Sequence, residues 1–136
     1  MSTLNIAKIM LPRPCTRVLY ENDTVRQALE TMAFHGYTAI PVLDEHGHYI
    51  GCATEGDFLR HVMESGSTDL KVHEHFKVSE ILRKNFCPAI QITSETGVVV
   101  KAILNQNFLP VVDDRNVLCG ILTRKAVILE LAGREE

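Results

Sequence analysis

The sequence predicts an α+β fold made of two tandem β-α-β-β-α repeats, packed sheet to sheet about a pseudo-twofold axis. Two observations predict it: one stretch of sequence occurs twice, and helical segments flank each copy. The first copy spans residues 40–54 (IPVLDEHGHYIGCAT) and the second spans residues 109–123 (LPVVDDRNVLCGILT). They align without a gap. The matched pairs are Pro41 with Pro110, Val42 with Val111, Asp44 with Asp113, Gly51 with Gly120 and Thr54 with Thr123.

The first repeat contains the full set of elements. Asp23 and Thr24 precede its first amphipathic segment, and such side chains favour a helix start because their oxygens accept unpaired backbone N–H groups. Residues 45–48 separate two apolar runs and include Gly47, as expected of a turn between strands. The predicted elements are an extended segment, a helix, two strands and a second helix: residues 16–20, 25–36, 38–44, 49–54 and 55–65.

The second repeat follows the same order. Its first helix is preceded by the polar residues 94–96, and its turn is residues 114–116. Residues 6–10 also resemble residues 78–82, although the register there differs by a short deletion near the first helix of the second repeat. The predicted elements are residues 88–92, 97–107, 108–113, 117–123 and 124–133.

These repeats divide the chain into two domains and a linker. Domain 1 is expected at residues 5–64, the linker at residues 65–77 and domain 2 at residues 78–133. The linker begins with Ser-Gly-Ser-Thr-Asp, a composition typical of a flexible connection. A single repeat is too small to bury its sheet alone, so we expect the two sheets to pack against each other.

Composition excludes several classes of partner. The 136 residues are 46% hydrophobic and 23% charged, as in an ordinary soluble globular protein. The net charge of -3 disfavours nucleic-acid binding. No apolar run approaches the ~20 residues of a membrane helix, and the N-terminal residues do not form a signal peptide. We therefore expect a cytoplasmic protein that contacts neither membrane nor nucleic acid.

At the end of the first repeated stretch the sequence reads GCATEGD, containing Gly51, Thr54 and Asp57. Each repeat resembles a CBS domain, in which this loop has the pattern Gly-h-h-Thr/Ser-x-x-Asp, and the pair resembles a Bateman module across roughly residues 5–133. The resemblance implies a regulatory protein without catalytic activity or cofactor. It also implies that an adenine nucleotide binds in the cleft between the repeats.

Asp57 is the candidate ribose-binding residue. It falls in the first turn of a predicted helix, where the helix dipole favours a carboxylate, and a carboxylate can accept two hydrogen bonds from a ribose diol. Thr54 can cap the same helix or bind a phosphate oxygen. The alternative is that Thr54 and Asp57 only cap the helix.

The resemblance implies roles for further residues of this site. The backbone of Thr38 and Ala39 would read the base, Ile40 and Pro41 would form an apolar wall, and Tyr37 would stack or remain at the rim. Thr16 lies in the extended segment that closes the pocket in the family. The corresponding positions of the second repeat are Phe108, Leu109, Pro110, Thr123 and Arg124.

The second repeat departs from the pattern at its last position. Its loop reads GILTRKA, so Gly120 and Thr123 are present but Ala126 replaces the aspartate. An alanine cannot accept a hydroxyl proton, which puts an ordinary second AMP or ATP site in doubt. Arg124 suits a phosphate; a plain exposed arginine is the alternative.

The identity of the ligand and of the partner remains open at this stage. AMP, ADP or ATP is the family default, and residues 108–128 also resemble stand-alone bacterial CBS pairs that bind cyclic di-AMP. We expect a homodimer that signals through an unknown effector protein. The dimer would bury an apolar helix face spaced for one side of each helix. That face comprises Val25, Leu29, Met32, Phe58 and Val62.

Two other classes remain as alternatives: a structural dimerisation module without ligand, and a small thiol-dependent enzyme using Cys15 or Cys52. No metal site is expected. His46 and His48 lie on a turn, and His73 and His75 are two residues apart and do not face each other on a helix.

Overall fold

The computed structural model describes residues 4–36 and 38–133, which form two compact units. The first-repeat unit is Arg17–Phe86. The second-repeat unit combines the chain up to Thr16 with the chain from Cys87 onward. Each unit has its own sheet and its own apolar core, so the α+β class and the two repeats are confirmed. The segment at the start of the chain therefore folds with the second repeat.

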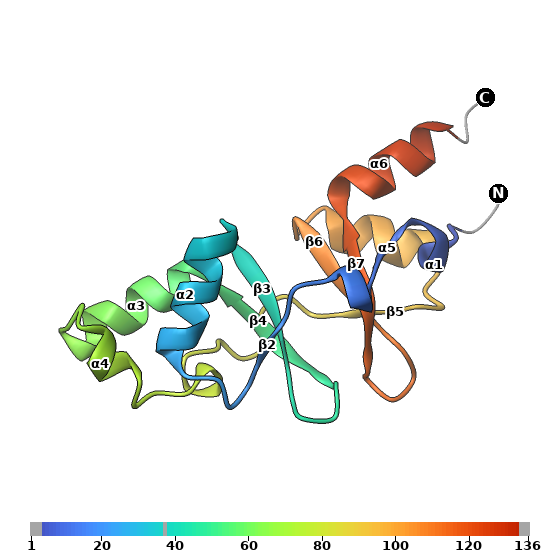
Figure 1. Ribbon diagram of the computed structural model, residues 1–136. Helices are drawn as coiled ribbons and strands as arrows, with labels where there is room; N and C mark the ends of the chain where they lie inside the picture. The colour runs from blue at the N-terminus through green and yellow to red at the C-terminus, as the bar shows by residue number, and fades with distance from the viewer. Residues whose placement is uncertain (1–3, 37, 134–136) are drawn as a thin grey trace. The chain divides into compact units, whose positions relative to one another are not determined.

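The first-repeat unit has a three-stranded sheet in the order β2-β3-β4 (Figure 1). Strand β2 (Leu19–Tyr20) runs parallel to β3 (Ala39–Leu43), which pairs antiparallel with β4 (Tyr49–Thr54). Its helical elements are α2 (Val25–His35), α3 (Glu55–Ser65), α4 (Leu70–His73) and the 3-10 turn η2 (Val78–Glu80).

Both ends of helix α2 are fixed by residues close by in the sequence. Thr24 accepts a hydrogen bond from the backbone amide of Gln27, whose side chain accepts one from the Thr24 amide in return. At the other end Gly36 adopts a left-handed conformation with φ of 68°, and its amide donates to the carbonyl of Met32. Both ends are satisfied locally, so the predicted helix over residues 25–36 is confirmed.

The residues between the repeats pack on the first-repeat unit. The Val25 amide donates to the carbonyl of Phe76 at 2.8 Å, and the Val78 amide donates to the carbonyl of Asp23 at 2.9 Å. Arg26 of α2 also forms an ion pair with Glu74. The segment is thus held by backbone hydrogen bonds at the start of α2.

The second-repeat unit has a four-stranded sheet in the order β1-β7-β6-β5. Strand β7 (Leu118–Thr123) pairs antiparallel with both β1 (Leu11–Pro12) and β6 (Phe108–Val112), and β6 runs parallel to β5 (Ile90–Gln91). Its helical elements are α1 (Ile6–Ile9), the 3-10 turn η1 (Arg13–Cys15), α5 (Thr96–Ile103) and α6 (Arg124–Gly133).

The two glycines matched by the repeat meet different surroundings. A Cβ added at Gly120 would lie 2.2 Å from the carbonyl oxygen of Leu11, a distance that no side chain tolerates. A Cβ at Gly51 would make ordinary contact with Leu82 at 3.4 Å. Gly120 is therefore required by the pairing of β1 with β7.

The apolar stripe expected to face a second copy of the chain lies largely in the core. Val25, Met32 and Phe58 are at most 6% exposed and pack with the sheet of their own unit, so this part of the interface prediction is wrong. Helical spacing shows which residues share one side of a helix, but not what packs against that side. Here the sheet of the same unit packs against it. The large apolar side chains that α2 and α3 expose are Phe34, Leu59 and Met63.

Candidate functional site

The predicted site residues are divided between the two units. The first-repeat unit contains Thr38, Ala39, Ile40, Pro41, Thr54 and Asp57, and the second-repeat unit contains Thr16, Phe108, Leu109, Pro110, Thr123 and Arg124. Tyr37 lies outside the described residues.

In the first-repeat unit, the end of β4 lies beside the start of β3. Ala39 pairs with Thr54 across the two strands, and the Glu55 amide donates to the carbonyl of Thr38 at 3.0 Å. Thr38 is exposed, whereas Ile40 is only 1% exposed and packs in the core. The strand pairing therefore brings the exposed residue Thr38, just before β3, next to the first turn of α3.

Thr54 and Asp57 form a reciprocal cap at the start of α3. The Thr54 amide and hydroxyl donate to Oδ2 of Asp57 at 2.9 and 3.0 Å, and the Asp57 amide lies 3.3 Å from Oγ1 of Thr54. Asp57 is 0% exposed. The capping alternative is thus present in the structure, and binding of a ribose by Asp57 stays a prediction.

Two arginines neutralise the buried carboxylate. Arg60, on the next turn of α3, donates through Nη2 to Oδ1 of Asp57 at 2.9 Å and to the carbonyl of Ile81 at 3.2 Å. Arg83 donates through Nε to the same Oδ1 at 2.9 Å, and its Nη2 lies 3.3 Å from Oγ1 of Thr54. The Arg83 guanidinium also lies 3.6 Å from the ring centroid of Phe86, a cation–π contact.

Sequence reasoning did not find these two arginines. For Arg60 a signal exists, because residues three apart on a helix are neighbours. Arg83 reaches Asp57 from 26 positions along the chain, and no local pattern predicts that contact.

The second-repeat unit repeats the backbone arrangement with different side chains. The Arg124 amide donates to the carbonyl of Asn107 at 3.1 Å, and the Ala126 amide donates to Oγ1 of Thr123 at 3.1 Å. Phe108 pairs with Thr123 as Ala39 pairs with Thr54. The helix cap thus remains, without the carboxylate.

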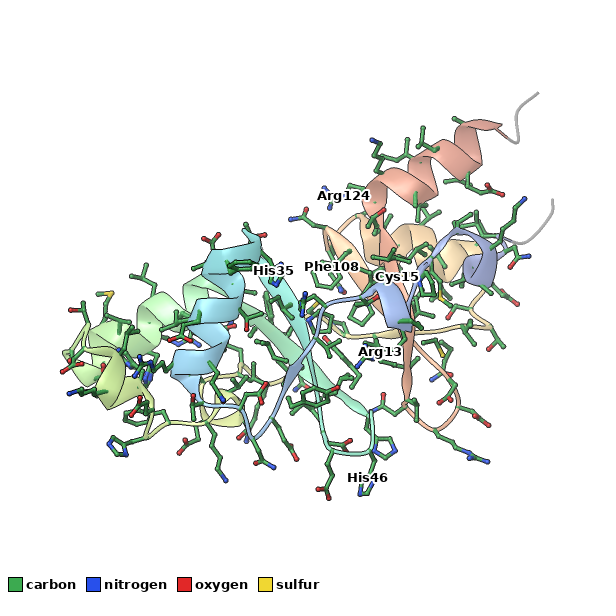
Figure 2. All side chains as sticks on the ribbon, in the orientation of Figure 1. Arg13, Cys15, His35, His46, Phe108 and Arg124 are labelled. Carbon is green, nitrogen blue, oxygen red and sulfur yellow. The ribbon has the colours of Figure 1, made fainter. Side chains whose placement is uncertain are left out.

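Arg124 holds the end of α5. Its Nε donates to the carbonyl of Ile103 at 3.1 Å and its Nη2 donates to the carbonyl of Gln106 at 3.1 Å. Figure 2 labels Arg124 at the start of α6 and Phe108 on β6 of the same unit. A phosphate bound by Arg124 would have to share the guanidinium with these carbonyls, and that role also stays a prediction.

Thr16 is engaged within the second-repeat unit. Its side chain is buried at 6% exposure, and the hydroxyl lies 3.0 Å from the carbonyl oxygen of Pro12 and 3.3 Å from that of Leu11. The hydroxyl therefore closes the turn after β1.

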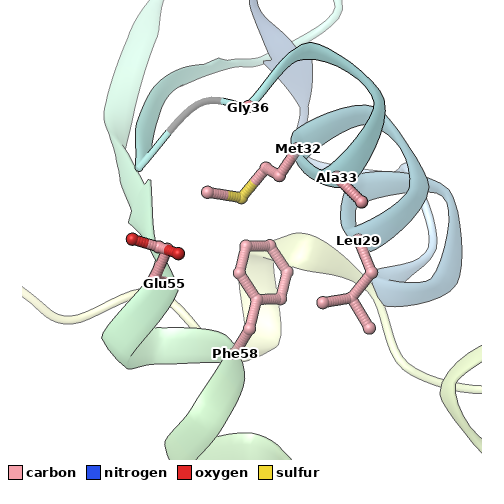
Figure 3. A pocket seen from close by; sticks show the side chains of 6 residues that line it. All are labelled: Leu29, Met32, Ala33, Gly36, Glu55 and Phe58. Atoms are coloured by element: carbon pink, nitrogen blue, oxygen red, sulfur yellow. The ribbon is translucent and has the colours of Figure 1, made fainter.

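A cavity of about 350 Å³ lies between α2 and α3 (Figure 3). Leu29, Met32 and Phe58 contribute apolar side chains to it, and Glu55 contributes a carboxylate from the start of α3. Of the predicted nucleotide-binding residues that the structure describes, none lines it. Its chemistry suits an apolar group rather than a phosphate.

Two buried histidines form a second polar cluster in the first-repeat unit. Nε2 of His61 lies 3.0 Å from Nδ1 of His73, and Nε2 of His73 lies 2.9 Å from the carbonyl oxygen of Ser67. Burial, and then the neighbouring His73, lower the pKa of His61, while Glu64 and Glu80 oppose that change. The lowered pKa favours the neutral form of His61.

The described residues form neither a metal-ion cluster nor a membrane-spanning helix. Among residues 4–36 and 38–133, no three or more His, Cys, Asp or Glu side chains are grouped so that they could hold a metal ion. Over the same part of the chain, no helix has the length and apolar character needed to cross a membrane.

Comparison with known families and curated proteins gives two findings. The model of the CBS domain matches residues 6–64 and 68–133. The chain is 26% identical over 110 residues to a homoserine O-acetyltransferase of Methanococcus vannielii, and 24% identical over 135 residues to an L-aspartate semialdehyde sulfurtransferase of Methanocaldococcus jannaschii. These matches cover 80% and 98% of the chain but only 21% and 25% of the length of those enzymes.

Solved structures share the fold. CbpB in complex with c-di-AMP superposes with a TM-score of 0.85 at 19% identity, covering 97% of this chain and 85% of that one. Listeria monocytogenes CbpB in complex with c-di-AMP gives 0.82 at 22% identity, covering 97% of each chain. CBSX2 in complex with AMP gives 0.76 at 24% identity, covering 97% of this chain and 98% of that one.

Proposed function

Because this chain belongs to the CBS domain family, we propose that it is a regulatory module that binds an adenine nucleotide and catalyses no reaction. Its proposed output is a change in its contacts with an effector protein. A ligand can drive such a change only through its different affinity for two states of the module.

The observation that carries this proposal is the arrangement at the start of α3. The exposed residue Thr38, the hydroxyl of Thr54 and the carboxylate of Asp57 lie together, with the Arg83 guanidinium beside them. These groups match the edge of a base, the hydroxyls of a ribose and a phosphate. Adenosine is common to AMP and c-di-AMP, the ligands with which similar folds are complexed.

We propose that the two repeats prefer different ligands. Asp57 suits a mononucleotide with free 2′ and 3′ hydroxyls, such as AMP. In a 3′,5′-cyclic dinucleotide the 3′ oxygen is esterified, and a carboxylate near the phosphate would be partly repelled. The second-repeat unit offers Thr123 and Arg124 without a carboxylate at Ala126, which tolerates a cyclic or phosphate-rich ligand.

The proposed assembly is a homodimer. Phe34 is 85% exposed on α2, and Leu59 and Met63 are 62% and 73% exposed on α3. An open depression of about 370 Å³ runs along the α3 surface between these last two residues. Neighbouring exposed apolar side chains of this size favour contact with another protein surface.

Three of the four thiols do not favour catalysis, whereas the fourth, Cys15, is exposed. Cys52 and Cys87 are buried, and burial is the main cause of the raised pKa of the Cys119 thiol. A reactive cysteine needs an exposed, stabilised thiolate, and these three positions do not favour one. The chain also matches only a fifth to a quarter of the length of its enzyme relatives, and a regulatory segment would account for such a partial match.

A structural module without ligand is the second candidate, because the donors around Asp57 already satisfy its carboxylate. Calorimetry with AMP, ATP and c-di-AMP separates the two candidates. We expect Asp57→Asn to weaken AMP binding by about 1–3 kcal/mol, the scale for a hydrogen bond to a charged group. Asp114→Asn, in an exposed turn, is the control.

The preference of each repeat is tested with the same titrations. Arg124→Ala should weaken c-di-AMP binding more than AMP binding, and Asp57→Asn should do the reverse. Absence of binding by every nucleotide, with none co-purifying by mass spectrometry, would favour the structural module.

A further inference from the structure

The carboxylate of Asp57 has no free acceptor position for a ligand. A carboxylate offers about four lone-pair sites, two on each oxygen. Oδ2 accepts from the amide and the hydroxyl of Thr54, and Oδ1 accepts from Arg60 and Arg83, all at 2.9–3.0 Å. With 0% exposure, the group does not contact solvent either. A ribose hydroxyl can therefore bind Asp57 only if one of these donors withdraws.

Arg83 is the donor that can withdraw at the smallest structural cost. The Thr54 groups form the cap of α3, and their loss would unpair the helix start. Arg60 is fixed in the same helix and also donates to the carbonyl of Ile81. The two arginine side chains are almost equally exposed, at 41% and 42%, and Arg83 also contacts Oγ1 of Thr54. Arg83, however, lies outside any helix or strand, so its withdrawal disturbs no regular element.

Withdrawal of Arg83 would leave neither partner unpaired. Asp57 keeps the charge of Arg60, so the buried carboxylate does not become an isolated ion, which would be costly. The Arg83 guanidinium keeps the face of Phe86, 3.6 Å from the ring centroid. The charges of Asp57 and Arg83 therefore have partners both when Arg83 is bound to Asp57 and when it has withdrawn.

Arg83 also lies in the segment that connects the two units. The first-repeat unit ends at Phe86, and the chain enters the second-repeat unit at Cys87. Asn85 and Cys87 have positive φ values of 55° and 58°, conformations that residues other than glycine adopt infrequently. A contact that fixes Arg83 therefore also restrains the start of this connection.

We propose that Arg83 competes with the ligand for Asp57. Without ligand, Arg83 holds the carboxylate and restrains residues 83–87. A nucleotide with free ribose hydroxyls replaces Arg83 on Oδ1 and releases the connecting segment. This inference rests on the proposed function, because it assigns a regulatory contact to the same nucleotide site.

The test compares Arg83→Gln with Lys84→Gln, which removes the neighbouring exposed charge. Adenosine is the titrant, because it has the ribose hydroxyls but no phosphate that Arg83 could bind. We expect Arg83→Gln to bind adenosine about 3–10-fold more tightly than the parent chain, since the competing donor is gone. Lys84→Gln should bind like the parent, and Arg83→Lys, which keeps a donor, should lie between them.

A second measurement follows the release itself. The side-chain Nε–H resonance of Arg83, identified by its absence in Arg83→Gln, should shift when adenosine is added to the parent chain. Tighter binding by Arg83→Gln, or binding by this variant alone, supports the inference. Binding by the parent together with unchanged or weaker binding by Arg83→Gln overturns the inference and leaves the proposed function standing. Absence of adenosine binding by the parent and by all three variants overturns the inference, whereas the proposed function is decided separately by the titrations with AMP, ATP and c-di-AMP.

Discussion

The starts of α3 and α6 have nearly the same backbone and opposite charge. In both, a threonine at the strand end caps the helix, and the next amide donates to a carbonyl before the neighbouring strand. Helix α3 then has Glu55 and Asp57 in its first turn, whereas α6 begins with Arg124 and Lys125. The repeat thus preserves a backbone junction while the side chains on it differ.

The arginines near the starts of α3 and α6 have different partners, because only α3 has an aspartate in its first turn. In the first-repeat unit, Arg60 and Arg83 converge on the carboxylate of Asp57. In the second-repeat unit, Arg124 donates to the carbonyl of Ile103, the last residue of α5, and to that of Gln106 in the segment after it. Helix α2 ends at Gly36 in a left-handed conformation, but α5 has no such glycine, and Arg124 supplies hydrogen bonds there. At the start of α3 the arginines neutralise a buried carboxylate, whereas at the start of α6 the arginine supplies hydrogen bonds to the end of α5.

The largest expected difference between the junctions is in stability. Asp57→Ala would leave two guanidinium groups and the Thr54 amide without their acceptor, so we expect the free energy of unfolding to fall by about 3 kcal/mol. The converse change, Ala126→Asp, adds an acceptor for the Thr123 amide and should change stability by less than about 1 kcal/mol. Urea denaturation measures both variants; equal losses would contradict the comparison.

A smaller effect is expected at the end of α5. Arg124→Ala removes two hydrogen bonds to the carbonyls of Ile103 and Gln106, and we expect a loss of about 1–2 kcal/mol. Lys125→Ala removes an exposed neighbouring charge and is the control. Hydrogen exchange should show faster opening of residues 104–107 in Arg124→Ala alone. Unchanged exchange there would mean that the arginine does not stabilise the helix end.

The two units should also differ in their response to acid. All six histidines of the chain lie within Arg17–Phe86. Because the pKa of His61 is lowered in the folded state, the unfolded state binds more protons once the pH falls below about 6.5. The free energy of unfolding should therefore decrease from pH 7 to pH 5, by at most about 1.4 kcal/mol per pH unit for one proton.

His61→Phe is the variant that tests this response. It should flatten the pH dependence of urea unfolding between pH 7 and pH 5, whereas His75→Asn, at an exposed position, should not. Hydrogen exchange at pH 5.5 should show that the first-repeat unit opens first. The same slope in His61→Phe and in the parent chain would assign the acid response to other groups.

Local signals in the sequence predicted much of this fold. Thr54 and Thr123 mark the starts of α3 and α6, and both helices span the residues expected. Helix α5 is shorter than predicted, ending at Ile103 rather than Asn107, because no residue after it forms a left-handed cap. The first strands of the repeats are confirmed in position but consist of two residues each.

Features that depend on distant contacts were not predictable. Arg83 on Asp57 and β1 on β7 join parts of the chain with no common local pattern. The sequence showed that α2 and α3 each have an apolar face. Helical spacing does not show whether such a face is buried by the unit's own sheet or by a second chain. Binding of nucleotide by Thr38, Thr54, Asp57 and Arg124 stays a prediction.

The pairing of β1 with β7 also bears on the order in which the protein folds during synthesis. Arg17–Phe86 is one continuous stretch, so the first-repeat unit can form as soon as that stretch leaves the ribosome. Leu4 donates to a side chain 92 residues later, and Leu11 finds its strand partner only when Ile121 has been made. Because contacts between distant residues form slowly, we expect the second-repeat unit to fold last. Until then the apolar residues Leu4 and Ile6 have no core to join and are exposed to chaperones and to aggregation.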